Sequence, residues 1–125
     1  MSAARDGWMT PVTDCLFCRI VTGQIPANLV AEGERVLAFR DLNPQAPTHV
    51  LVIPKLHVAS LAAVQDGQWD HVAAVTSLAA RVARELGLAE SGYRCVFNSG
   101  RDAGQTVHHL HLHLLGGRPM LWPPG

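Results

Sequence analysis

The stretch that decides the fold is GQTVHHLHLHLLGG, residues 104–117. Within it, His109, His111 and His113 alternate with leucines. Successive side chains of a β-strand point to opposite faces, so a strand here places the three imidazoles on one face and the leucines on the other. A helix turns by ~100° per residue and would scatter the imidazoles. Because glycines bound the stretch at both ends, the pattern predicts a strand that carries a row of imidazoles.

Length and composition are typical of one globular domain. The chain has 125 residues, of which 48% are hydrophobic and 16% charged, and its formal net charge is zero. This balance argues against general binding to nucleic acid or to anionic membranes, but not against one nucleotide in a local site or against a dimer. No apolar run reaches the ~18–20 residues of a membrane span, and the N-terminus lacks the apolar region of a secretory signal. We therefore expect a cytoplasmic protein whose three cysteines are reduced thiols or metal ligands.

The remaining periodicities predict an α+β domain. Residues 1–13 are expected to form a flexible tail, followed by a single domain over residues 14–125. A short helix is expected from Cys15 to Thr22 with Asp14 as its cap, and a long amphipathic helix from Gln68 to Leu86. Short connections favour antiparallel neighbours, so we expect a mainly antiparallel five-stranded sheet. Besides the histidine strand, its members are predicted at residues 29–32, 36–40, 49–54 and 93–98.

Three imidazoles on one strand face favour a chemical role over a purely structural one. Protonated together they would repel one another, and buried without partners they would be costly. Residues 104–107 can present backbone N–H groups and a hydroxyl to an anion, and Asn98 adds an amide. Arg101 and Lys55 either add positive charge or are simply solvated. The arrangement suits attack of an unprotonated imidazole nitrogen on phosphorus, with nearby donors holding the charge of the phosphoryl oxygens.

Several stretches resemble one known superfamily. HHLHLHLL resembles the signature of the histidine triad (HIT) proteins. DCLFCRIVTGQIPA, FRDLNPQAPTHVLVIPKLHV, FNSGRDAGQTVHHLHLHLLGGRP and the terminal WPPG resemble the Hint branch, the histidine triad nucleotide-binding proteins, over residues 14–125. This resemblance implies a two-fold dimer whose sheets join across the interface. It also implies binding of purine nucleoside monophosphates and hydrolysis of nucleoside phosphoramidates and aminoacyl adenylates.

The resemblance also implies a role for each histidine. His111 matches the nucleophile, which forms a nucleotidyl-imidazole intermediate that water then resolves. His113 matches the position that contacts the phosphate, and His49 matches the histidine that tunes the nucleophile from the preceding strand. His109 matches a hydrogen-bonding and orienting position. Thr106 stands where the family usually has a serine that assists the leaving group; its hydroxyl can donate the same bond, although its methyl group restricts the rotamer.

Further positions match the residues around the nucleotide. Asp41 matches the acid that holds the ribose hydroxyls. For Ile20 and Phe39 the alternative is an ordinary place in the core. Trp122 either reaches the partner's active site or packs within its own chain. The apolar slot for the base is expected from Phe17, Ile20, Phe39 and Leu42, and the phosphate and ribose surroundings from Asn98, Gln105 and Val107.

Cys15 and Cys18 form a C-x-x-C pair, a second candidate functional group. Such a pair needs two more ligands to make a tetrahedral zinc site. The resemblance to zinc-binding bacterial HIT proteins implies that His49 and His109 complete a structural zinc site. The alternative is that both thiols are core residues of a helix face. If His49 holds zinc, it cannot also relay a proton to the nucleophile, so these two roles exclude each other.

Three functional hypotheses follow. The first is a dimeric phosphoramidase acting on purine nucleotides. The second is a dinucleoside polyphosphate hydrolase, against which the GGRP and WPPG segments argue. The third is a nucleotide-binding, zinc-stabilised adaptor with vestigial catalysis, which predicts nucleotide binding without a covalent intermediate.

Overall fold

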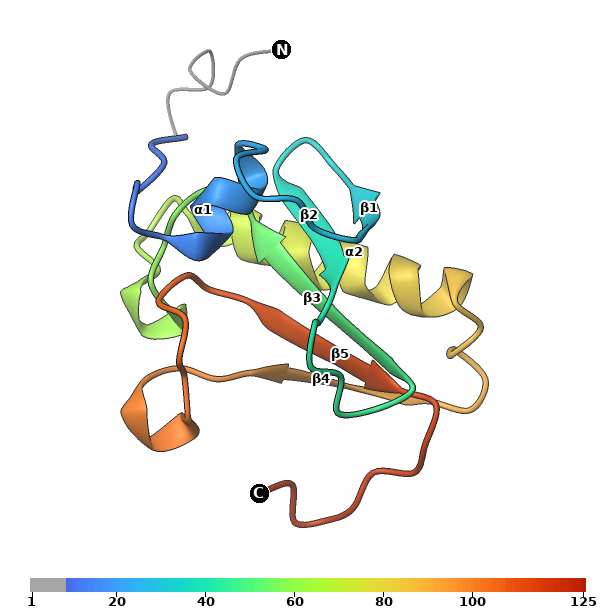
Figure 1. The fold of residues 1–125 in the computed structure, drawn as a ribbon. Helices are drawn as coiled ribbons and strands as arrows, with labels where there is room; N and C mark the ends of the chain where they lie inside the picture. Colours follow the sequence, from blue (N-terminus) through green and yellow to red (C-terminus); the bar gives the residue numbers. More distant parts are fainter. Residues whose placement is uncertain (1–8) are drawn as a thin grey trace.

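A single antiparallel sheet organises the molecule. The structure is a computed structural model that describes residues 9–125, so the first eight residues of the predicted tail lie outside the described residues. The sheet has the order β1-β2-β3-β5-β4, and every neighbouring pair is antiparallel (Figure 1). This arrangement confirms the predicted α+β class and five-stranded sheet. The strands are β1 (Leu29–Glu32), β2 (Val36–Arg40), β3 (Thr48–Pro54), β4 (Tyr93–Phe97) and β5 (Leu112–Gly116).

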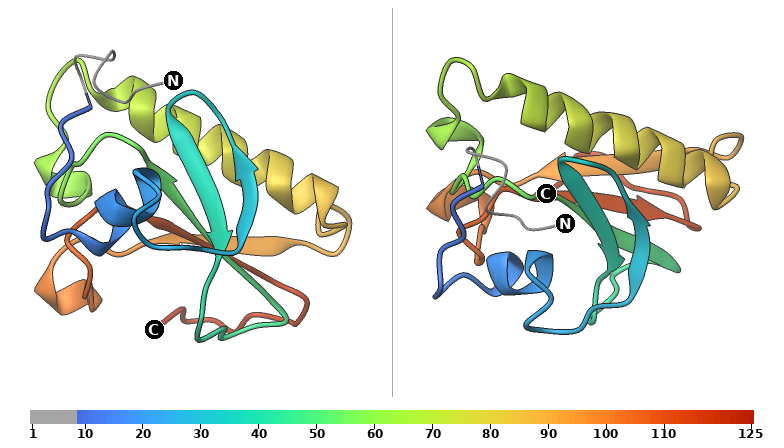
Figure 2. Two further views of the ribbon diagram at one scale, coloured as in Figure 1. Left: turned by 45° about the horizontal axis from the view of Figure 1, so that its top comes forward. Right: turned by 90° about the horizontal axis from the view of Figure 1, so that it is seen from above.

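Two α-helices cover opposite faces of the sheet. The long helix α2 (Trp69–Glu85) lies across one face, and the short helix α1 (Leu16–Val21) lies against the other (Figure 2). Alternating side chains of the strands serve the two layers: Val50 and Val52 pack under α2, whereas Leu51 packs under α1. Two single 3-10 turns, η2 (Leu61–Ala63) and η3 (Arg101–Ala103), lie in connections. Within residues 9–125, neither α-helix combines the length and the apolarity that crossing a bilayer requires.

The start of α1 differs from the prediction. Its N-cap is Cys15 and not Asp14, and the Cys15 sulfur accepts a hydrogen bond from the Cys18 backbone N–H at 3.3 Å. The hydrogen-bonding cap is thus a residue of the C-x-x-C pair itself. Consequently the conformation of the pair and the start of the helix are set together.

Regular pairing of the histidine strand begins later than predicted, at Leu112, so that only the last of the three histidines lies within β5. Two bonds interrupt the ladder before that point. The backbone N–H of Leu110 donates to the carbonyl of Val58 at 2.7 Å, and the carbonyl of His109 accepts from the His111 side chain at 2.7 Å. The predicted alternation persists through this segment, since the leucines are buried under α2 while the histidines face the α1 side.

Candidate active site and metal centre

His111 is held in one tautomer by the residue two positions before it. Its Nδ1 donates to the backbone carbonyl of His109 at 2.7 Å, and the side chain is buried, with 7% of its surface exposed. A carbonyl can only accept, so in the neutral ring Nδ1 carries the proton and Nε2 keeps its lone pair. The ring of Phe17 lies edge-on at 5.2 Å between centroids and fixes the imidazole plane. In this tautomer Nε2 carries the lone pair that a nucleophile requires.

His113 lies at the end of a directed chain of hydrogen bonds. The Gln45 backbone N–H donates to Nδ1 of His49 at 3.0 Å, and Nε2 of His49 lies 2.9 Å from Nδ1 of His113. Because the amide can only donate, the proton of neutral His49 is on Nε2 and points to His113, whose own proton is then on Nε2. Burial, and then the neighbouring imidazoles of His111 and His49, lower the pKa of His113 to about 4. Burial also lowers the pKa of His49, so both rings are neutral at pH 7 and His113 presents an N–H donor.

An apolar cavity of about 250 Å³ adjoins this chain. Asp41 stands on its wall, where Oδ1 accepts from the Asn43 backbone N–H at 2.7 Å and Oδ2 lies 3.5 Å from Nε2 of His49. Leu42 projects from the rim with 97% of its surface exposed. The cavity brings together six of the residues predicted around the nucleotide: Phe17, Ile20, Phe39, Asp41, Leu42 and Val107.

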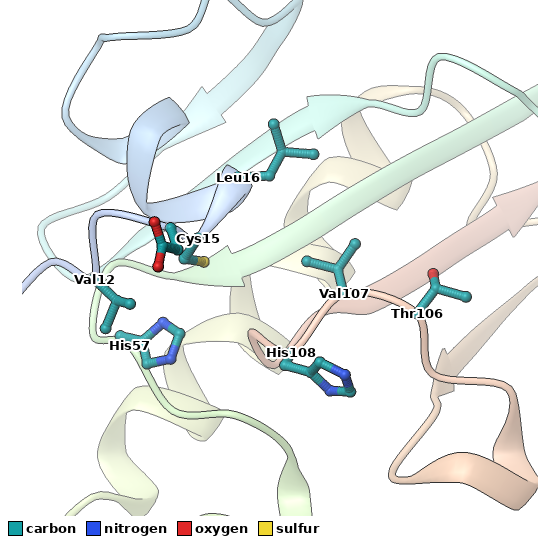
Figure 3. Close-up of a pocket in the computed structure, with 8 residues that line it drawn as sticks. Val12, Cys15, Leu16, His57, Thr106, Val107 and His108 are labelled. Carbon is teal, nitrogen blue, oxygen red and sulfur yellow. The ribbon is translucent and has the colours of Figure 1, made fainter.

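Thr106 belongs to the loop between η3 and β5 and is exposed. It lines a second cavity of about 390 Å³, together with Val107, His108 and residues at the start of α1 (Figure 3). The Gln105 side chain braces this loop, since its Nε2 donates to the carbonyls of Ala59 at 2.7 Å and Val107 at 2.9 Å. The amide of Gln105 is therefore committed to the loop that presents Thr106.

Three other predicted polar residues stand apart from these cavities. Asn98 follows β4 and lines neither of them. Lys55 pairs with Glu32, with Nζ and Oε2 2.6 Å apart, and exposed Arg101 pairs with its neighbour Asp102 at 3.0 Å. The two cations are thus engaged in ion pairs on the protein itself.

A metal centre lies beside the triad. Cys15, Cys18, His57 and His109 place their ligand atoms within 4.8 Å of one another. Nδ1 of His109 lies 3.3 Å from Sγ of Cys15, 3.7 Å from Sγ of Cys18 and 3.2 Å from Nδ1 of His57. A tetrahedral zinc ion, with Zn–S of ~2.3 Å and Zn–N of ~2.0–2.1 Å, separates its ligand atoms by about 3.3–3.8 Å. The separations around Nδ1 of His109 therefore match those of a tetrahedral zinc site.

The surroundings of the metal centre fit zinc as well. Nε2 of His109 donates to the carbonyl of Pro54 at 2.8 Å, which leaves Nδ1 free to ligate and supplies the outer hydrogen bond typical of zinc-bound histidine. Burial lowers the pKa of His109 to about 4 and lowers that of His57, so both imidazoles are neutral ligands. Burial raises the pKa of the Cys18 thiol to about 11, so the thiolate form depends on the charge of a bound cation.

The predicted fourth zinc ligand, His49, is wrong, and His57 takes its place. His49 lies near the beginning of β3, opposite Leu115, whereas the cysteines lie beyond the other end of that strand. Both of its ring nitrogens are already engaged, by Gln45 and His113. The conflict between zinc binding and proton relay is thereby removed, because separate histidines serve the two sites.

The comparisons with known proteins agree with this architecture. A family model described as HIT domain matches residues 22–120. The chain belongs to the HIT domain family. The 14 kDa zinc-binding protein of Zea mays is 43% identical over the full length of both chains, and the purine nucleoside phosphoramidase of Escherichia coli (strain K12) is 40% identical over 86% of this chain and 90% of that protein. A HIT family hydrolase from Legionella pneumophila Philadelphia 1 superposes with a TM-score of 0.87 at 53% identity, covering 90% of this chain and 100% of that one.

The zinc ligand His57, which the sequence analysis did not predict, can be found from the sheet topology. In an antiparallel pair, the residues that precede one strand lie next to those that follow its partner. Val52 of β3 pairs with Leu112 of β5, so the segment before β5 that holds His109 lies beside the segment after β3 that holds His57. Applying the predicted antiparallel pairing to KLH at residues 55–57 therefore indicates His57 as the partner of His109.

Proposed function

We propose that this HIT domain is a hydrolase that cleaves the P–N bond of purine nucleoside phosphoramidates through a covalent nucleotidyl-His111 intermediate. In aminoacyl adenylates it cleaves the corresponding P–O bond. The observation that carries the proposal is the pairing of two imidazoles whose hydrogen bonds are complementary. His111 offers a lone pair at Nε2, and the adjacent His113, whose ring centroid is 5.0 Å away, offers an N–H. The relative in E. coli named purine nucleoside phosphoramidase supports this substrate class.

The first step transfers the nucleotidyl group to the protein. The base occupies the apolar cavity, Asp41 accepts from the ribose hydroxyls, and the Nε2–H of His113 donates to a phosphoryl oxygen. Nε2 of His111 forms a bond to phosphorus while the P–N bond breaks. The departing nitrogen takes up one proton from solvent, relayed by the hydroxyl of Thr106, and leaves as a neutral amine.

The second step restores the enzyme. Water attacks phosphorus, the bond between phosphorus and Nε2 of His111 breaks, and the proton of the water replaces the one given to the amine. The products are a nucleoside monophosphate and an amine. Throughout, the hydrogen bond between Nδ1 of His111 and the carbonyl of His109 stabilises the positive charge that the ring acquires in the intermediate.

Replacing the nucleophile tests the proposal. The variant His111→Ala is expected to lose turnover of adenosine 5'-phosphoramidate while it still binds adenosine monophosphate in a calorimetric titration. A matched control is His71→Ala, because His71 lies on α2 and lines neither cavity, so turnover per folded molecule should be unchanged. Turnover by His111→Ala at the wild-type rate would contradict the proposal. Nucleotide binding by the wild-type protein without any turnover would favour the adaptor hypothesis.

We further infer a two-fold dimer formed through β4. In the sheet of the described residues β4 is an edge strand paired only with β5, and Tyr93 on it is 39% exposed. The apolar C-terminal segment lies next to it, since Nη2 of Arg94 donates to the carbonyl of Leu121 at 2.9 Å, and Trp122 is 83% exposed. Pairing of two β4 edges places Trp122 close to the partner chain. Sedimentation equilibrium should return the mass of a dimer, and a monomer at micromolar concentration would refute the inference.

A further inference from the structure

We propose that the metal centre positions the nucleophile as well as stabilising the fold: the zinc ligands hold Phe17 and the carbonyl of His109, and these two groups set the orientation and tautomer of His111. The proposal rests on the proposed function only in naming His111 the nucleophile. Its structural content, a metal-dependent tautomer, is measurable without turnover.

The first connection runs through His109. Its side chain is fully buried and is held at both nitrogens, with Nδ1 among the ligand atoms and Nε2 on the carbonyl of Pro54 at 2.8 Å. The backbone carbonyl of the same residue accepts the 2.7 Å bond from Nδ1 of His111. A residue held at both ring nitrogens has little freedom to rotate its backbone. The metal therefore fixes the acceptor that keeps the proton of His111 on Nδ1.

The second connection runs through α1. This helix has only six residues, which is too short to be stable without tertiary contacts. Its two cysteines are ligands on either side of Phe17, whose side chain is 4% exposed. The Phe17 ring packs edge-on against His109 at 5.8 Å and against His111 at 5.2 Å, with interplanar angles of 72° and 87°. The metal thus ties α1 to the sheet, and α1 presses Phe17 against the nucleophile.

A purely structural metal and a positioning metal predict different losses. Without the acceptor and the packing, the imidazole of His111 also populates the tautomer with the proton on Nε2, where no lone pair is available for attack. The rate per active site then falls, by roughly tenfold for the loss of one orienting hydrogen bond. Loss of a purely structural metal lowers the melting temperature but leaves the rate of each folded molecule unchanged.

The variant His57→Ala separates the two cases. His57 supplies a ligand atom, and within residues 9–125 its hydrogen-bonding and ring contacts are with His109 and Cys18 and not with Phe17 or His111. Zinc content, kcat per active site from burst titration, and the ¹⁵N signals of the His111 ring are measured at 25 °C. We expect loss of zinc, a roughly tenfold lower kcat and a mixed tautomer of His111. Excess zinc should restore all three.

Two further variants keep the test decisive. His57→Cys preserves four ligands as a Cys₃His site, so it should retain zinc, kcat and the wild-type His111 signals. Val82→Ala removes buried volume under α2, on the opposite face of the sheet, and should lower the melting temperature with no change in kcat per active site or in the His111 signals. If His57→Ala does not fold, chelator titration of the wild-type protein followed by the His111 ¹⁵N signals gives the same comparison.

The overturning result is a zinc-free protein whose His111 signals and kcat per active site match the wild type. Absence of turnover in the zinc-loaded wild-type protein would instead defeat the proposed function and leave the tautomer measurement standing. The two failures are therefore distinguishable.

Discussion

His49 makes two hydrogen bonds that different substitutions remove separately. Its Nδ1 accepts from the Gln45 backbone at 3.0 Å, and its Nε2 donates to His113 at 2.9 Å. In His49→Asn the amide oxygen occupies the place of Nδ1, so the bond to the loop is kept and the bond to His113 is lost. In His49→Gln the longer side chain carries its amide nitrogen to the place of Nε2, so the bond to His113 is kept and the bond to the loop is lost.

The two losses differ in kind. Removing the bond to Gln45 affects folding and should lower the free energy of unfolding by about 0.5–1.5 kcal/mol. Removing the bond to His113 leaves the Nδ1 of His113 without its donor, which frees the ring to present the wrong nitrogen to the phosphoryl oxygen. A loss of about 1–2 kcal/mol in the transition state lowers kcat roughly 5- to 30-fold. His49→Asn should therefore be the slower enzyme and His49→Gln the less stable protein.

Urea unfolding at pH 7 gives the stability of each variant, and steady-state turnover of adenosine 5'-phosphoramidate gives kcat. Both substitutes are neutral amides without a ring, so the direct comparison between them cancels much of the effect of lost volume. A faster His49→Asn than His49→Gln would refute the directed chain from Gln45 through His49 to His113.

Three further predictions follow from single sites. Thr106→Ser keeps the hydroxyl and should preserve kcat. Thr106→Ala should lower kcat roughly tenfold with little change in the Kd for adenosine monophosphate. Equal kcat values for the two variants would show that Thr106 takes no part in proton transfer. Leu42→Ala should raise the Kd for adenosine monophosphate roughly 3- to 10-fold by calorimetry, and should leave urea unfolding unchanged because the side chain is 97% exposed; an unchanged Kd would exclude Leu42 from the base slot. The pKa of His113 is lowered to about 4 in the folded protein, from about 6.5 in the unfolded chain, so between these two pH values the unfolded chain binds the proton more tightly. The free energy of unfolding should therefore be highest above about pH 6.5 and decrease as the pH falls towards 4. A rise in the free energy of unfolding over that range, measured by urea titration, would contradict a neutral His113 ring in the folded protein.

Short apolar runs separated by turn residues predicted the first two strands. The predicted strands over residues 29–32 and 36–40 agree with β1 and β2 residue for residue, because the turn at Gly33 and Glu34 separates the two runs. The long helix is confirmed over Trp69–Glu85, within one residue of the predicted range at each end, because its apolar stripe has a single sheet face to cover. Such features depend on local sequence and burial alone.

Features that depend on side chains competing with the backbone were not predictable from the pattern. The strand predicted over the histidines begins only at Leu112, because the carbonyl of His109 bonds to the His111 side chain. Cys15 replaces Asp14 as the helix cap because its sulfur turns toward the Cys18 N–H. The choice of His57 over His49 as zinc ligand depended on which end of β3 meets the segment before β5, a matter of register that residue spacing does not contain.

The covalent intermediate tests the proposed mechanism most directly. The wild-type protein is mixed with adenosine 5'-phosphoramidate, quenched in base within one turnover, digested and examined by mass spectrometry. We predict an adenylyl group on the tryptic peptide that spans residues 102–125, localised to His111 by fragmentation and absent from the His111→Ala variant. An active enzyme that yields no adduct in the pre-steady state, or an adduct on His113 instead, would contradict the assignment of His111 as the nucleophile.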